Sequence, residues 1–459
     1  MQRLILTLVL AALIPLTLPS RSYAVPAEGH RILVAGPSPD SVRIVERIHS
    51  EGGNVVDAAV AVAFGLSVTH PYYAALGGGG FALVKMGKEK TALDFREMAP
   101  KSANPDTYKG KPGLASMNGG LAVGVPGVPA GLYDLHKKFG KLKWAKVVTP
   151  AIELAEKGFE VSGEWAEYTE RNQPRFSDAG KKVFFDAKGA PLKPGDLLKQ
   201  PALAKLLKRI RTEGPKAFYQ GENAKELVAL VNASGGAYAM EDLANYKTRW
   251  LEPIKAKFLG YDLTLMPPPS SGGVVIAQAV RLLEKIDLAK KTEALSADEY
   301  HGMIEVEKLS FRNRSSLGDP DFTKNPIAEL TSEDALDKLA KMIDLKKALP
   351  SAKLMNEAER KAIEGAKAEE EQTTHFSVMD AAGNTVALTV TLNGDYGSGL
   401  VTKSGVALNN EMDDFTTQPG KPNMFGLIQG EANAVRAGAR PLSSMSPSIV
   451  EKDGETVLS

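Results

Sequence analysis

Residues 53–68 constrain the fold most, because this stretch is apolar on every side rather than along one face. Alanines stand at positions 58, 59, 61 and 63, and valines fill several of the others. A helix that is hydrophobic all round belongs in the interior of a large core. A chain of 459 residues is long enough to build such a core. The sequence therefore predicts a buried, closely packed helix at 53–68.

Short apolar runs after a four-glycine stretch predict strands. Residues 77–80 are all glycine, FALV follows at 81–84, and LDFR at 93–96 predicts a second strand. The glycines do not follow the dinucleotide-binding pattern, so a tight turn packed against a helix is the favoured interpretation. A helix is expected near 133–139, and residues 140–310 are mostly helical by pattern, with an interruption at PPPSSGG.

The composition changes sharply at residue 373. Residues 351–372 are rich in Lys, Glu and Ala, which is typical of an exposed helical segment. The chain then alternates as TTHFSVMD, turns at AGN and returns as TVALTVTLN. This period of two around a turn sequence predicts a β-hairpin.

Charge and composition exclude several functional classes. The chain is 43% hydrophobic and 24% charged, which is ordinary for a soluble globular protein. Its 56 Lys and Arg balance 55 Asp and Glu, so no electrostatic footprint for nucleic acid or an anionic membrane is visible. The absence of cysteine excludes disulfides, thiolate metal sites and a Cys nucleophile. The six histidines lack metal-binding spacing, so we expect neither a metal nor an organic cofactor.

Residues 1–24 have the organisation of a secretory signal peptide. Arg3 supplies the positive charge, residues 4–18 the apolar stretch and SYA at 22–24 a small-x-small cleavage site. Pro15 and the short apolar run argue against a membrane-spanning helix, which needs about 20 residues. An uncleaved anchor is the alternative. We expect an exported protein, periplasmic or secreted.

Thr373 is the candidate nucleophile, because the G-x-S-x-G, S-x-x-K and Walker A signatures are missing. A threonine that cleavage of the preceding bond leaves at a new amino terminus carries its own general base. Its α-amine has a pKa near 8, so part of it is neutral at pH 7. Periodicity alone favours an ordinary strand threonine over this hypothesis.

Several multi-residue motifs support the hypothesis and occur in a fixed order. They are GGNVVDAAVA, the glycine run, LDFREMAP, LAVGVPGVPAGL, PPPSSGG, QTTHFSV, GNTVALTVTLN, GSGL, ALNNEMDDF, PGKPNMFGL and RPLSSMSPSIV. Together they closely resemble the gamma-glutamyltransferase (glutathione hydrolase) family, from about residue 52 to residue 459. The resemblance implies an N-terminal nucleophile hydrolase with an α/β fold, a four-layer αββα sandwich.

The resemblance also implies a processing step and a reaction. The precursor would cut itself between Gln372 and Thr373, giving a heterodimer of a large-subunit region (25–372) and a small-subunit region (373–459). Thr373 would attack the γ-glutamyl amide of glutathione, form an acyl-enzyme, and pass the acyl group to water or to an amino-acid or peptide acceptor. Thr391 matches the threonine that hydrogen-bonds the nucleophile and assists processing.

The γ-glutamyl group presents a zwitterionic end, which needs a cation for its carboxylate and anions or acceptors for its ammonium. Arg96 matches the family's carboxylate clamp, where a guanidinium suits bidentate binding. Hydroxyl donors and ammonium partners are implied at Ser443, Ser444, Asn393, Glu411 and Asp414.

Two positions depart from the family pattern. Phe425 stands where bacterial members often carry a tyrosine whose hydroxyl bonds to the residue matching Asn393, so we expect a looser lid. The sequence stops at Ser459, before the Gly-Gly turn that forms the family's oxyanion hole. We therefore expect a sandwich truncated at its carboxyl-terminal end, with activity in question.

Two alternatives stay open. A glutaryl or cephalosporin-type acylase of the same fold acts on substrates without an α-ammonium and would not need Asp414. That aspartate and the lid-like segment 419–433 favour the transferase. The second alternative is an uncleaved, inactive exported protein that binds γ-glutamyl compounds, and the early stop is its best support.

Overall fold

The computed structural model describes residues 32–294, 296–355, 360 and 373–459. The predicted signal peptide, Gln372 of the predicted cleavage site and most of the charged segment 351–372 lie outside the described residues. Within those residues, no helix has both the length and the apolar character needed to cross a bilayer.

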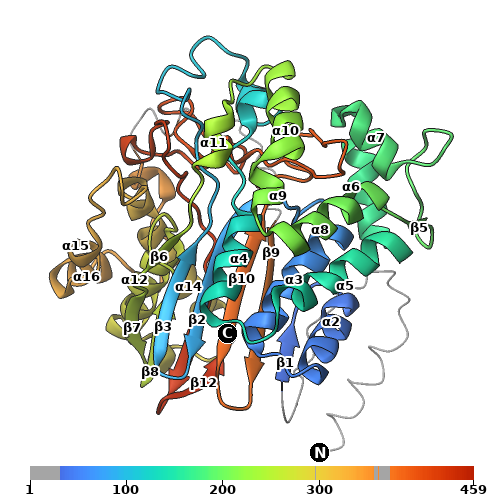
Figure 1. Ribbon diagram of the computed structural model, residues 1–459. Coiled ribbons are helices and arrows are strands. Elements are labelled where there is room, and N and C mark those ends of the chain that lie inside the picture. Colours follow the sequence, from blue (N-terminus) through green and yellow to red (C-terminus); the bar gives the residue numbers. More distant parts are fainter. Residues whose placement is uncertain (1–31, 295, 356–359, 361–372) are drawn as a thin grey trace, which may run out of the picture.

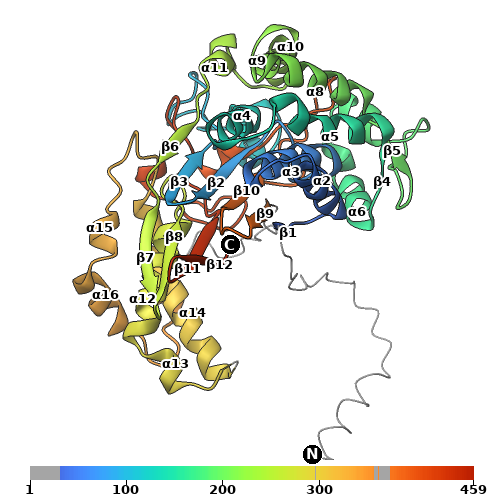
Figure 2. The ribbon, with the colours of Figure 1, turned by 60° about the horizontal axis from the view of Figure 1, so that its bottom comes forward.

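Two antiparallel sheets lie face to face (Figures 1 and 2). The larger sheet has the order β1 (Ile32–Ala35), β9 (Thr373–Asp380), β10 (Thr385–Thr391), β2 (Gly79–Met86), β3 (Glu89–Asp94) and β6 (Arg249–Leu251). The smaller sheet has the order β12 (Glu455–Leu458), β11 (Ser448–Lys452), β8 (Tyr261–Leu265) and β7 (Ile254–Phe258). Buried side chains between the two include Phe81, Leu83, Ala387 and Ile449.

Helices cover the outer face of each sheet (Figure 2). The larger sheet carries α2 (Pro39–Ser50), α3 (Val55–Thr69), α4 (Val128–Phe139), α5 (Trp144–Lys157) and α8 (Pro201–Glu213). The smaller sheet carries α12 (Gly272–Lys285), α14 (Ala297–Arg312) and α16 (Glu333–Ala340). The four-layer αββα sandwich predicted from the motifs is therefore confirmed.

The remaining elements are short or peripheral. They are β4 (Phe159–Glu160), β5 (Leu197–Leu198), α6 (Gly163–Asn172), α7 (Asp178–Phe184), α9 (Lys216–Tyr219), α10 (Gly221–Ala233), α11 (Met240–Ala244), α13 (Leu288–Lys291) and α15 (Ile327–Leu330). The stretch 140–310 is thus mostly helical, as predicted, but its pattern concealed strands β4 to β8.

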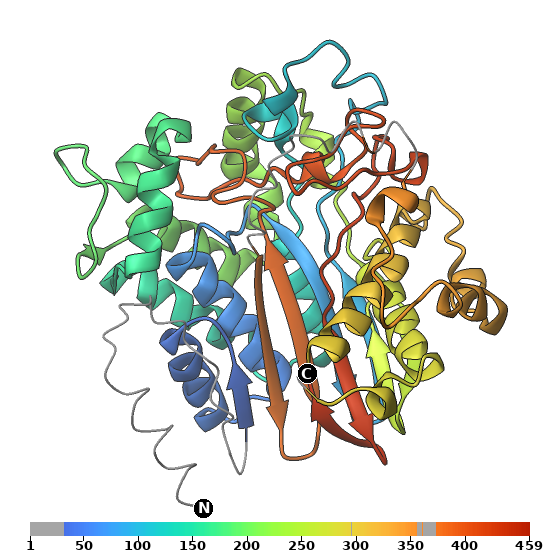
Figure 3. The same cartoon turned by 180° about the vertical axis from the view of Figure 1, so that it is seen from behind.

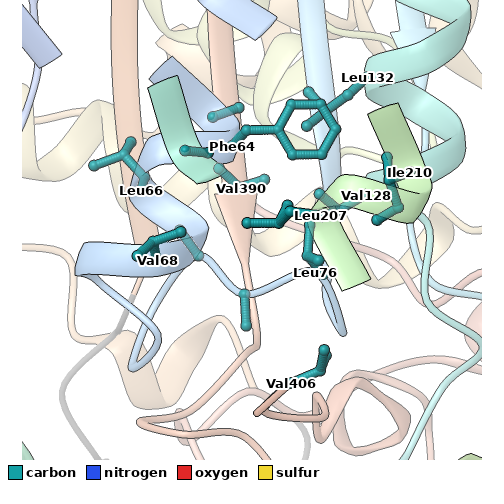
Figure 4. Close-up of a cluster of buried hydrophobic side chains, with 14 of the residues drawn as sticks. Phe64, Leu66, Val68, Leu76, Val128, Leu132, Leu207, Ile210, Val390 and Val406 are labelled. Atoms are coloured by element: carbon teal, nitrogen blue, oxygen red, sulfur yellow. The ribbon is translucent and has the colours of Figure 1, made fainter. Parts of the chain in front are cut away.

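The predicted buried helix is α3, and every one of its residues is buried. Phe64, Leu66 and Val68 belong to a buried cluster that includes side chains from α4, α8 and β10 (Figure 4). The helix begins with a capping box in which Asn54 and Asp57 each bond the other's backbone N–H. The Asp57 carboxylate also accepts from the backbone N–H groups of residues 141 and 142.

The predicted hairpin is β9 and β10, which lie in the middle of the larger sheet (Figure 3). Thr373 at the start of β9 pairs with Thr391 at the end of β10, and Thr391 pairs in turn with Gly79 of β2. The strand predicted at 93–96 ends earlier, at Asp94. The Asp94 carboxylate accepts from the backbone N–H of Arg96, at 2.9 Å, so Arg96 lies beyond the sheet.

We predict that Asp57→Asn destabilises the fold by about 2–4 kcal/mol at pH 7, because the buried carboxylate satisfies several backbone N–H groups. Although burial raises the pKa of Asp57, His136 and these N–H groups lower it overall. The stabilisation by this carboxylate is therefore fully present above its pKa in the unfolded chain, about 3.9. It is lost as the pH falls through the lower pKa that Asp57 has in the folded protein.

Thermal unfolding measured from pH 7 down to pH 3 checks this prediction. The difference between the wild type and Asp57→Asn should shrink in acid. The exposed Glu46, changed to Gln, is the matched control and should leave the melting temperature unchanged. A constant difference across the pH range would contradict the assignment to the carboxylate.

Candidate active site

The glycine run brings the start of β2 against the end of β10. A Cβ added at Gly78 would lie 2.0 Å from the carbonyl oxygen of Thr391, and one at Gly80 would lie 2.1 Å from that of Thr389. The expected contact with a helix is also present, since the Gly78 carbonyl accepts from residues 127 and 128 at the start of α4. The glycines therefore allow the close backbone approach that places Thr391.

Two threonine hydroxyls meet where β9 begins and β10 ends. The Oγ1 atoms of Thr373 and Thr391 lie 3.3 Å apart, within hydrogen-bond distance. The Thr391 hydroxyl also accepts from the backbone N–H of Asn393, at 2.9 Å. The side chain of Thr373 is exposed, whereas that of Thr391 is buried beneath it.

A cavity of about 360 Å³ opens beside these hydroxyls. Its lining includes all eight side chains that the sequence predicts as site residues: Arg96, Thr373, Thr391, Asn393, Glu411, Asp414, Ser443 and Ser444. It also includes Phe425, which the sequence singles out as a lid residue. The lining residues that sequence reasoning missed are Arg314, His375, Thr389, Leu427, Met445 and Ser446.

Arg96 is 1% exposed and is surrounded by carboxylates. Its guanidinium donates to Glu411, to Asp414 at 2.5 Å, and through Nε to the carbonyl of Pro441 at 3.2 Å. Although burial lowers the pKa of Arg96, Glu411, Asp414 and Glu97 together raise it above its ordinary value. The predicted cation and two of the predicted anions thus form one buried cluster.

Glu97 adds a third carboxylate to this cluster. It is fully buried, lies 3.9 Å from Arg96, and neither of its oxygens has a hydrogen-bond partner among the described residues. Burial raises the pKa of Glu97 to about 7, although Arg96 opposes the shift. Burial likewise raises the pKa of Glu411 well above its ordinary value. A single guanidinium therefore faces more acid groups than it neutralises.

Asn393 follows β10 in a strained backbone conformation, with φ at +77°. Such angles are uncommon outside glycine, although asparagine tolerates them better than most residues. The Asn393 amide donates to the carbonyl of Asn410 at 3.1 Å. Asp395 and Gly397 lie farther along the same loop. Arg175, which does not line the cavity, donates to their carbonyls and so holds the turn.

Ser443 and Ser444 lie on the segment that leads into β11. The backbone of Ser443 is fixed from α12, because Ser271 donates to its carbonyl through both N–H and Oγ, each at 2.8 Å. The hydroxyl of Ser444 accepts from Nε of Arg314, at 3.2 Å. Arg314 is 4% exposed and also donates to Gln429, at 2.6 Å. No local sequence pattern predicts Arg314 as a lining residue, because its partners Ser444 and Gln429 are distant from it in sequence.

His375 also lines the cavity, from the strand that Thr373 begins. Its ring nitrogens lie 2.8 Å from the hydroxyl of Thr389 and 3.2 Å from that of Ser377. Desolvation by the surrounding protein lowers the pKa of His375 and favours the neutral ring, although the residue is exposed at the mouth of the cavity. Among the described residues, no group of three His, Asp or Glu side chains is arranged to hold a metal ion.

Comparisons with known proteins agree on one family. The sequence model described as Gamma-glutamyltranspeptidase matches residues 42–459. The glutathione hydrolase proenzyme of Pseudomonas aeruginosa is 43% identical over 432 residues, which are 93% of this chain and 75% of that relative. The glutathione hydrolase proenzyme of Escherichia coli is 43% identical over 444 residues, which are 94% of this chain and 75% of that relative.

Solved structures similar to this chain include a gamma-glutamyltranspeptidase and an acylase. The gamma-glutamyltranspeptidase from Pseudomonas nitroreducens complexed with L-DON is similar with a TM-score of 0.66 and 38% identity, over 70% of this chain and 96% of that one. The cephalosporin acylase from Bacillus halodurans is similar with a TM-score of 0.78 and 26% identity, over 95% of this chain and 79% of that one.

We predict that Gly78→Ala destabilises the protein by about 1–3 kcal/mol, because the new methyl group would overlap the Thr391 carbonyl. Thermal unfolding should show a lower melting temperature. Gly113→Ala is the matched control, since nothing lies within 4 Å of a Cβ built there. Equal melting temperatures for the two variants would mean that β2 and β10 can separate without cost.

Proposed function

The chain belongs to the gamma-glutamyltranspeptidase family, and on this premise we propose that it transfers γ-glutamyl groups through a Thr373 acyl-enzyme. Donors are glutathione and related γ-glutamyl compounds, and acceptors are water, amino acids or peptides. The observation that carries the proposal is that one cavity is lined both by the paired threonine hydroxyls and by the buried arginine–carboxylate cluster.

Recognition of the donor uses the Arg96 cluster. The contacts of Arg96 with described residues engage three of the five N–H groups of a guanidinium. Two N–H groups are therefore left for the α-carboxylate of the γ-glutamyl group. Glu411, Asp414 and the side-chain oxygen of Asn393 surround its α-ammonium, and the added positive charge offsets the excess of acid groups in the cluster.

Catalysis begins when the peptide bond before Thr373 is cleaved. The free α-amine takes the proton of the Thr373 hydroxyl while Oγ1 forms a bond to the γ-carbonyl carbon. The amide C–N bond then breaks, the leaving amine receives the proton, and a threonyl ester remains. Water or an acceptor amine attacks this ester and regenerates the hydroxyl. The Thr391 hydroxyl, 3.3 Å from Oγ1, orients the nucleophile throughout.

The chain is exported and processed in this proposal. Residues 1–24 direct it to the periplasm, or out of the cell, and are removed. Cleavage after Gln372 yields a heterodimer of 25–372 and 373–459. The printed name of the Pseudomonas aeruginosa relative, a proenzyme, supports a precursor. The pairing of β9 with β1 and of β10 with β2 crosses between the two fragments and would hold them together after the cut.

An acylase that acts on glutaryl or cephalosporin-type amides is the second candidate. The similarity to a cephalosporin acylase over 95% of this chain favours it. Such substrates carry no α-ammonium, however, and would leave the carboxylates of Glu411 and Asp414 beside Arg96 without a ligand cation. This charge arrangement favours the γ-glutamyl donor.

We predict that Thr373→Ala abolishes turnover of a γ-glutamyl anilide by at least about 10³-fold, because it removes the nucleophile. Intact mass should show two species that meet at the 372–373 bond in the wild type and one uncleaved species in the variant. The control is Thr212→Ala, which removes an exposed hydroxyl on α8 and should change neither result. Faster turnover of a glutaryl anilide by the wild type would favour the acylase, and turnover of neither anilide would contradict both candidates.

A further inference from the structure

One side chain organises the turn of residues 423–427 over the cavity. The carbonyl oxygen of the Asn423 side chain accepts from the backbone N–H groups of Phe425, at 3.1 Å, and Leu427, at 3.0 Å. The backbone of Asn423 is bonded to Leu427 and Gly426 as well. Because Phe425 and Leu427 line the cavity, Asn423 fixes the part of the turn that faces it.

The other end of the same amide reaches the donor cluster. Nδ2 of Asn423 donates to Oδ1 of Asp414, at 3.2 Å, while Oδ2 of Asp414 accepts from Arg96 at 2.5 Å. The carboxylate of Asp414 is thus held on two sides. Its rotation would break either the bond to Arg96 or the bond to the turn.

The turn has a separate anchor that does not involve Asp414. The neighbouring carboxylate of Asp413 accepts from the backbone N–H of Met424, at 2.9 Å. The sulfur of Met424, which is buried, lies 3.5 Å from the amide nitrogen of Asn393. The segment is therefore attached to the protein even without the Asn423 amide. The contact of Asn423 with Asp414 is thus not needed to hold the turn in place.

From these contacts we infer that Asn423 is a positioning residue that couples the 423–427 turn to Asp414 and thereby sets the affinity for the donor's α-ammonium. The inference rests on the proposed function. An amide is suited to the task, because its oxygen accepts the turn's N–H groups while its nitrogen donates to a carboxylate. Alanine can do neither. Serine can accept from a backbone N–H two residues on, but is too short to span to Asp414 as well.

Because residue 425 is a phenylalanine, the contact between Asn423 and Asp414 is especially important in this chain. A phenylalanine ring has no hydroxyl with which to bond across the cavity, so the turn contacts the ammonium side of the cavity through the Asn423 amide and the Met424 sulfur. The sulfur contact is weak, because a thioether is a poor acceptor. Asn423 therefore supplies the stronger of these two contacts.

Binding of two small acids separates this role from a general loosening of the turn. L-glutamate carries both the α-carboxylate and the α-ammonium of the donor, whereas glutarate lacks the ammonium. For Asn423→Ala, calorimetry should show the Kd of L-glutamate raised by roughly tenfold, as for a lost hydrogen bond to a charged group. The Kd of glutarate should change by less than about twofold. The exposed Lys421 on the same segment, changed to Ala, is the control and should leave both affinities unchanged.

Asn423→Ser provides a second variant if the alanine variant does not fold. For this variant, too, the Kd of L-glutamate should rise more than the Kd of glutarate. An equal rise in both Kd values would overturn the inference, because it would mean that the turn has merely loosened. Unchanged Kd values would overturn it as well. If the wild type turns over the γ-glutamyl anilide but the variants bind L-glutamate normally, the coupling is refuted and the proposed function is not. A wild type with neither turnover nor L-glutamate binding would refute both.

Discussion

The buried guanidinium of Arg96 joins three segments that are distant in sequence, and the geometry of the cavity depends on it. It extends from the chain just after β3, bonds the 3₁₀ turn Glu411–Asp414, and reaches the carbonyl of Pro441. Removing one partner of such a buried pair typically costs about 3–5 kcal/mol, because an unpaired charge remains.

The larger sheet supplies the other half of the cavity through backbone registration rather than charge. The pairing of β9 with β10 sets Thr373 opposite Thr391, and the glycines of β2 allow the close approach that fixes the end of β10. The strained backbone at Asn393 then turns the chain away from the sheet. Asn393, the proposed ammonium ligand, thus follows by two residues the strand partner of Thr373, the proposed nucleophile.

The sequence predicted the parts of this arrangement whose signals are local. The stretch 53–68 is apolar on every side, the hairpin at 373 alternates with a period of two, and the motif resemblance identified all eight predicted lining residues. The strand predicted at 93–96 is observed at 89–94, so the prediction began four residues too late and ended two residues too late. Neither the charged start of this strand nor the bond from the Arg96 N–H to the Asp94 carboxylate is visible in an apolar pattern. Arg314 and Asn423 were missed, because each acts through partners brought near only by folding. The expected looser lid stays a prediction.

The balance of charge in the cluster favours a zwitterionic ligand over a simple diacid, in agreement with the proposed function. Glu97, Glu411 and Asp414 face one guanidinium, and burial raises the pKa of both Glu97 and Glu411. A ligand ammonium would stabilise their ionised forms, so its binding and the release of a proton from the cluster are linked. A ligand carboxylate alone would add a further negative charge beside Glu97 and Glu411, whose pKa values are already raised by burial. The selectivity proposed for the γ-glutamyl group therefore follows from the electrostatics of the cluster as much as from the shape of the cavity.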